Sequence, residues 1–67
     1  MKQEKFTSKE QSVMNVLNEN HLTSYEILQK VEGISLLLVL YRVLDQLHNK
    51  GALLSYMKED RKYHYVC

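Results

Sequence analysis

Histidine and cysteine carry the strongest intrinsic chemistry in this chain of 67 residues. His64 and Cys67 are spaced as two metal ligands can be, and zinc favours imidazole and thiolate. Two ligands do not complete a site, however, and on one strand these two side chains would point to opposite faces. His21 and His48 are scattered, and no nucleophile, base and carboxylate have the spacing of a catalytic centre. We therefore expect no metal site, no cofactor and no enzyme, and interpret His64 and Cys67 as structural or surface residues.

A second set of residues is suited to nucleic acid. Tyr41 and Arg42 are adjacent in a helical pattern, where an arginine can fork onto guanine and a tyrosine hydroxyl can reach a phosphate. Alternatively, Arg42 pairs with Asp45 or Gln46 on a solvated helix face, and the sequence leaves both interpretations open.

A cluster of basic residues near the C-terminal end could also touch phosphate or a minor groove. It consists of Lys58, Arg61 and Lys62, within and just after a charged turn. The alternative is an ordinary charged hairpin turn, which the intervening Glu59 and Asp60 favour. The full set of predicted DNA-binding residues is Ser35, Tyr41, Arg42, Gln46, Lys58, Arg61 and Lys62.

The element that must position Tyr41 and Arg42 is a long predicted helix over residues 36–49. Ser35 can cap its first turn, and Gly51 can adopt the left-handed conformation after its last turn. Apolar residues recur at three- and four-residue steps and predict one buried side. These residues are Leu36, Leu40, Val43, Leu44 and Leu47, with Leu37 on the flank.

Two shorter helices are predicted upstream, each opened by a T-x-x-E capping box. Thr7 and Glu10 start a helix near residues 8–19, and Thr23 and Glu26 start one near 24–32. Their predicted buried residues are Val13, Met14, Val16, Leu17, Ile27, Leu28 and Val31.

Downstream of the long helix the pattern changes to the alternation of strands. Residues 52–56 and 62–66 predict an antiparallel hairpin with a charged turn of about five residues. His21 and Leu22 could add a short third strand. Three helices followed by a hairpin predict a small α+β fold, the winged helix-turn-helix, in which the hairpin is the wing.

Composition bounds the remaining possibilities. The chain is long enough for one domain over residues 1–67, of which we expect 1–5 to be frayed. No segment has the pattern of a signal peptide or a membrane span, and the only cysteine is the last residue, so we expect a cytoplasmic protein without membrane contact. A formal net charge of +1 neither favours nor excludes nucleic acid.

The segment YRVLDQLHNKGALL resembles the Y-R-x-L-x-x-L-x-x-x-G signature of the ferric uptake regulator family, which consists of metal-responsive repressors. FTSKEQSVMNVL and HLTSYEILQKV are similar in spacing to the first two helices of that family's winged-helix DNA-binding domain. The resemblance implies that residues 36–49 are a recognition helix and that Tyr41 and Arg42 face double-stranded DNA.

The departures from the family pattern support a different function. Leu38, Val39 and Leu40 replace a small polar run, and Ser35 lies one residue further from Tyr41 than the family's serine. Glu10 stands where the family usually has an arginine, and a carboxylate repels phosphate. No counterpart of the dimerising, metal-binding domain is present, so metal sensing is not expected.

A protein-binding module is the alternative function, for example an inhibitor encoded by a phage or another mobile element. It would act through the apolar outward face around Leu38 and Val39. A single winged helix contacts only half of a palindromic site, so we expect a homodimer or a larger partner that covers Leu38 at least partly.

Overall fold

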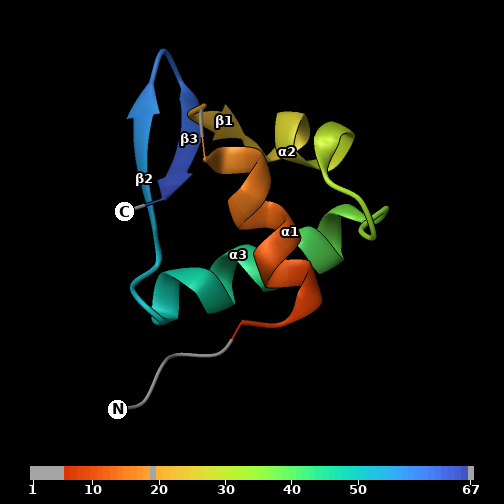
Figure 1. Cartoon of the computed structure of the whole chain (residues 1–67). Coiled ribbons are helices and arrows are strands. Elements are labelled where there is room, and N and C mark those ends of the chain that lie inside the picture. Colours follow the sequence, from red (N-terminus) through yellow and green to blue (C-terminus); the bar gives the residue numbers. More distant parts are fainter. Residues whose placement is uncertain (1–5, 19, 67) are drawn as a thin grey trace.

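The computed structural model describes residues 6–18 and 20–66, which form three helices and a three-stranded antiparallel sheet (Figure 1). The helices precede a β-hairpin, as predicted, and the arrangement is consistent with a winged helix. The elements in chain order are α1 (Ser8–Leu17), β1 (Leu22–Thr23), α2 (Ser24–Lys30), α3 (Leu37–Asn49), β2 (Leu53–Lys58) and β3 (Arg61–Val66).

Capping boxes start the first two helices, which confirms a prediction made from short sequence patterns. The Glu10 backbone N–H donates to Thr7 Oγ1 at 3.1 Å, and the Thr7 N–H donates to Glu10 Oε1 at 2.9 Å. Thr23 and Glu26 make the same reciprocal pair at 3.3 and 3.0 Å. Each box satisfies backbone donors that a helix N-terminus leaves without partners.

The start of α3 differs from the prediction. Leu36 is the N-cap residue, and its side chain makes no capping hydrogen bond, so the cap predicted for Ser35 is wrong. Leu36 has extended backbone angles, φ −111° and ψ 132°, and its side chain is 64 % exposed. α3 begins one residue later, at Leu37, so Leu36 does not lie on the buried side of the helix. The prediction that Leu36 is one of its buried residues is therefore also wrong.

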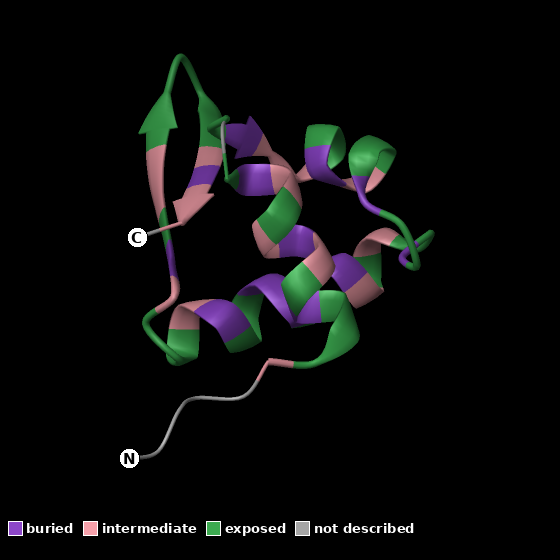
Figure 2. Cartoon of the chain, viewed as in Figure 1, coloured by how far each residue is buried: buried purple, intermediate pink, exposed green. Residues whose placement is uncertain are grey.

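The core lies where the three helices meet the inner face of the sheet (Figure 2). Leu40 and Leu47 are fully buried, as the spacing in α3 predicts, and Leu37 is half-buried on the flank. The full set of buried apolar residues is Val13, Leu17, Leu22, Ile27, Val31, Ile34, Leu40, Val43, Leu44, Leu47 and Leu53.

β3 is the central strand of the sheet, between β1 and β2. The predicted third strand is present but lies one residue later than expected, pairing Leu22 with His64 and Thr23 with Tyr63. Burial of Leu22, Leu53 and His64 identifies the inner face of the sheet. The hairpin extends beyond the helices, and its tip is exposed (Figures 1 and 2).

The hairpin turn is shorter than predicted. Lys58 pairs with Arg61, so the turn contains only Glu59 and Asp60 instead of about five residues. Both turn residues have positive φ, 52° and 67°. Two left-handed residues match the right-handed twist of the flanking strands, which is why two-residue hairpins favour this geometry.

The other boundaries shift by a few residues. α2 ends at Lys30, with Val31 as the C-cap in an extended conformation, before the predicted end at 32. Gly51 has φ +77°, as predicted for the residue that follows α3. α1 ends at Leu17, and its predicted end at residue 19, like the predictions for residues 1–5 and Cys67, lies outside the described residues. In the part of the chain that the structure describes, no helix has the length and apolar character needed to span a bilayer.

Candidate nucleic-acid interface

The outward side of α3 is a ridge between two surface grooves. Leu38 is 80 % exposed, and Arg42 and Asp45 are also exposed. Arg42 lies on a solvated helix face, as the alternative interpretation expects, but among the described residues it makes no ion pair with Asp45 and no hydrogen bond with Gln46. The guanidinium is therefore available to an external partner.

One groove lies between α3 and the start of α1, and we call it the α1–α3 groove. It holds Arg42 and Gln46, two of the predicted DNA-binding residues. It also holds Lys9, which the sequence pattern did not single out because this lysine lies 33 positions before Arg42 in the chain. Val39, a predicted interaction residue, is half-buried in this groove and packs against the core. The lining residues are Thr7, Ser8, Lys9, Val39, Arg42, Val43 and Gln46.

The second groove lies between α3 and the hairpin, and we call it the α3–wing groove. Tyr41, which is 46 % exposed, lines it together with Lys62 from β3. Tyr41 and Arg42 are adjacent in sequence but lie in different grooves, because successive helical residues are rotated by about 100°. The lining residues are Ser24, Tyr41, Leu44, Asp45, His48, Lys62 and His64.

Two imidazoles form the inner end of the α3–wing groove. The rings of His48 and His64 meet edge to face, with their centroids 5.9 Å apart. His64 is only 6 % exposed, and neither its Nδ1 nor Nε2 of His48 has a hydrogen-bond partner among the described residues. Burial, with smaller contributions from the positive charges of His48 and Lys62, lowers the pKa of His64 to about 4. His64 is therefore neutral at physiological pH and acts as a core residue, consistent with the structural role expected from the sequence.

No metal centre is formed in residues 6–18 and 20–66. There is no group of three or more histidine, cysteine, aspartate or glutamate side chains that could hold a metal ion in this part of the chain.

The three basic residues of the hairpin do not form one cluster. Lys58 and Arg61 are directly paired across the strands and point to the outer face of the sheet, whereas Lys62 pairs with Met57 and points to the other face. Arg61 and Lys62 nevertheless both line a surface pocket beside Tyr25 and Asp60, whereas Lys58 does not. The sequence did not reveal which of these residues share a face, because their pairing depends on a turn of two residues, and a turn of about five was predicted.

Ser35 is exposed and lies between Ile34 and the N-cap residue of α3. Since it makes no cap, its hydroxyl is not committed to the first turn. It remains near the N-terminal end of the ridge that carries Leu38.

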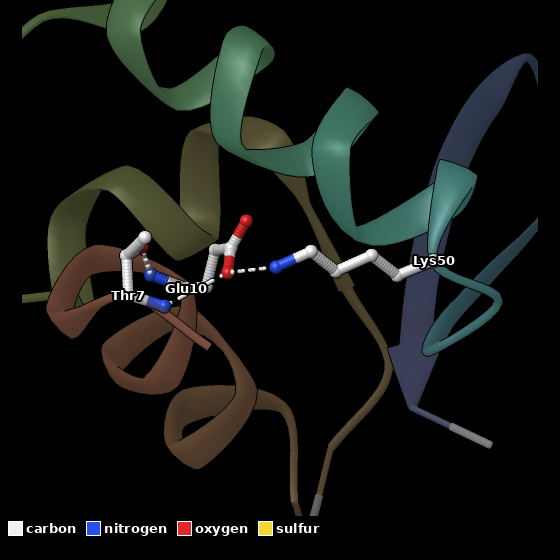
Figure 3. Close-up of polar contacts among 3 residues, drawn as sticks. All are labelled: Thr7, Glu10 and Lys50. Atoms are coloured by element: carbon white, nitrogen blue, oxygen red, sulfur yellow. Dashed lines mark hydrogen bonds and ion pairs between the residues drawn. The ribbon is translucent and has the colours of Figure 1, made fainter. Parts of the chain in front are cut away.

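Glu10 does not present a free carboxylate to this surface. Its side chain is buried, 1 % exposed, and Lys50 Nζ donates to Glu10 Oε1 at 2.8 Å from the residue that follows α3 (Figure 3). The Lys50 ammonium also lies 5.0 Å from the centre of the Phe6 ring. The expected repulsion between Glu10 and phosphate is therefore largely cancelled by a partner 40 positions away in the chain.

The protonation of Glu10 follows from the same contacts. Burial raises the pKa of this carboxyl, but the hydrogen bonds from Lys50 and Thr7 and the charge of Lys50 together hold the pKa below its usual value. Glu10 is thus ionised at neutral pH and ties the start of α1 to the end of α3 (Figure 3).

Comparison of the chain with protein-family models, with curated proteins and with solved structures finds no match. The resemblance to the ferric uptake regulator family stays a prediction from the residues quoted above.

Proposed function

We propose that this protein is a small winged-helix DNA-binding protein, a transcriptional regulator that reads duplex DNA with α3 and contacts the backbone with its hairpin. The observation that carries the proposal is the placement of cations on both sides of the α3 ridge. Lys9 and Arg42 lie in the α1–α3 groove, and Lys62 lies in the α3–wing groove.

This placement fits the geometry of duplex DNA. A helix that enters the major groove has one phosphate backbone on each side, so a cation on each flank can neutralise both strands. Arg42 and Gln46 lie on the part of α3 that would face base edges, where arginine pairs with guanine and glutamine with adenine. Tyr41 would donate its hydroxyl to a phosphate on the wing side.

Arg42→Ala tests the proposal directly. Arg42 is exposed and makes no ion pair among the described residues, so the substitution should leave the melting temperature almost unchanged. It should weaken binding to a preferred duplex by about 1–3 kcal/mol and relax the preference at one base pair. Candidate duplexes would come from selection on a random library with the parent protein.

Lys30→Ala is the matched control, because Lys30 is an exposed cation at the end of α2 and lines neither groove. Equal affinity of the parent and Arg42→Ala for every selected duplex would refute a reading role for Arg42. Parent protein that selects no duplex at low salt would refute the proposal as a whole.

A second candidate function rests on Leu38, which is 80 % exposed at the centre of the ridge. Burying one leucine side chain contributes about 1.5–3 kcal/mol, enough to favour a protein surface over water. In this alternative the ridge binds a second copy of the chain or a larger protein, and the protein acts as an inhibitor or antagonist.

Leu38→Ser separates the two functions, because it removes the apolar side chain from the ridge without adding a carboxylate that would repel phosphate. The fold should be retained, because Leu38 lies outside the core, while self-association or binding to a protein partner should fall. Sedimentation of both forms over a range of concentrations measures this directly. A parent that remains monomeric, and a variant that binds DNA as the parent does, would make Leu38 an ordinary surface residue.

Catalysis is not part of either proposal. We infer a binding protein without a cofactor because the groove residues serve charge neutralisation and hydrogen bonding. The cytoplasmic location expected from the sequence stays a prediction.

A further inference from the structure

The outer face of the sheet carries a continuous group of aromatic rings that the proposed duplex interface does not use. We call this group the aromatic platform; it consists of His21, Tyr56, Tyr63 and Tyr65. Tyr63 lies directly opposite Tyr56 in the β2–β3 ladder, and their rings are 5.6 Å apart at an angle of 15°. His21 stacks on Tyr65 with the ring centres 4.8 Å apart.

The platform is held in place by its own contacts. His21 Nδ1 and the Tyr56 hydroxyl are 2.8 Å apart and share a hydrogen bond, and the Tyr56 ring lies 5.7 Å from that of Tyr65. Such ring pairs add to stability beyond the burial of their apolar surface. The three tyrosines are half-buried and His21 is exposed, so solvent reaches the platform even though its rings support one another.

The charged strand residues beside the aromatic platform are all positive. Lys58 and Arg61 pair two residues closer to the tip than Tyr56 and Tyr63, and therefore lie on the same face. The other outward residues of the strands are Thr23 and Leu54, so no strand residue places a carboxylate on this face. Acids lie at the borders of this face: Glu59 and Asp60 form the turn, and Glu26 accepts a hydrogen bond from the backbone N–H of Thr23, the residue paired with Tyr63.

We infer that this face binds single-stranded nucleic acid, with bases stacked on the aromatic platform and phosphates held by Lys58 and Arg61. Aromatic rings beside cations are the combination by which proteins hold unpaired bases, because every base has a face to stack and every nucleotide has a phosphate. Duplex DNA hides its base faces, so the platform does not suit the partner proposed for α3. The two surfaces are therefore separate and can be tested separately.

The experiment titrates the whole chain into a labelled dT oligonucleotide and, in parallel, into a duplex. The chain has five tyrosines and no tryptophan, so quenching of tyrosine fluorescence by stacked bases gives a second readout. The parent should bind the single strand at low salt with quenched emission. No binding of the single strand by the folded parent would overturn the inference.

Two substitutions at Tyr63 distinguish base stacking from the effect of apolar side-chain volume. Tyr63→Phe retains the ring and should bind as the parent does, whereas Tyr63→Leu retains apolar volume without a π face and should bind roughly five- to a hundredfold more weakly. Tyr63→Phe should melt close to the parent temperature, whereas Tyr63→Leu loses the ring pair with Tyr56 and should melt a few degrees lower, so binding is measured well below both melting temperatures. Equal binding by Tyr63→Leu and the parent would refute a stacking role for the platform.

Arg61→Ala tests the cations without altering the rings. It should reduce the slope of log affinity against log salt by about 0.7, the value for one phosphate contact on a single strand. Lys30→Ala removes an exposed cation that lies in neither groove and outside the strands, and it should leave the single-strand slope unchanged. An unchanged slope for Arg61→Ala, or an equal reduction in Lys30→Ala, would contradict the assignment, whatever the duplex titration shows.

Discussion

Replacement of His64 by leucine should make the protein resistant to mild acid. The His64 side chain is 6 % exposed, and its pKa is lowered to about 4 from an ordinary value of 6.5. Between these two values the unfolded chain binds a proton that the folded chain does not bind. Stability is therefore retained above the ordinary pKa and lost as the pH falls from 6.5 toward 4.

The size of the loss follows from the same two values. At about pH 5 the unfolded state has gained most of its proton and the folded state almost none. The free energy of unfolding should therefore fall by about 2 kcal/mol relative to neutral pH. This change is large compared with the total stability of a domain of this length.

The assay is urea unfolding followed by circular dichroism at about pH 7, 6 and 5, with the parent and His64→Leu compared at each pH. Glu10, whose pKa is lowered, loses its contribution to stability only at lower pH, so it does not interfere in this range. His64→Leu should abolish most of the fall, and it should be at least as stable as the parent at neutral pH. The reason is that Nδ1 of His64 is buried without a partner among the described residues.

His21→Asn is the control, since His21 is exposed, and it should retain the fall. Lys62→Met should reduce the fall, because Lys62 is one of the positive charges that lower the pKa of His64. An equal loss of stability on acidification in His64→Leu and the parent would show that another group is responsible.

Two further predictions concern the turn and the Glu10 ion pair. Asp60→Gly should raise the free energy of unfolding by about 1 kcal/mol, since Asp60 has φ 67° and glycine adopts this conformation without steric cost. The control Glu59→Ala should give no gain in stability. Unchanged stability in Asp60→Gly would mean that the turn is not left-handed. Lys50→Met should lower the free energy of unfolding by about 1–3 kcal/mol, because it leaves the Glu10 carboxylate buried without its cation. The double variant Glu10→Gln with Lys50→Met should lose less than the sum of the single variants, and strict additivity would contradict a direct coupling.

Local patterns in the sequence predicted the local parts of the fold. Thr7 with Glu10, and Thr23 with Glu26, lie three residues apart, so each capping box is complete within one helical turn. The buried side of α3 followed from spacing because Leu40, Leu44 and Leu47 lie within the helix. Leu36 did not follow the same rule, since the residue lies outside the helix and the periodicity does not apply to it.

Features that depend on distant residues were not predictable from short patterns. The role of Glu10 depends on Lys50, which reaches it from the C-terminal end of α3 (Figure 3). The placement of Lys58 and Arg61 on one face and Lys62 on the other depends on a two-residue turn of Glu59 and Asp60. This turn lacks the Asn-Gly, Asp-Gly or Gly-Gly pair by which such turns are usually recognised in a sequence. The outer-face tyrosines do alternate in the sequence, and that alternation could have identified the aromatic platform.

Mapping of the backbone amide shifts of the labelled protein during titration with a selected duplex tests the proposed function most directly. A reading role for α3 predicts that the largest changes fall on Arg42 and Gln46, with Lys9 and Lys62 on the two flanks, while Tyr63 and Tyr65 stay unperturbed. Changes confined to other surfaces, or none up to a large excess of duplex, would contradict DNA recognition by this helix.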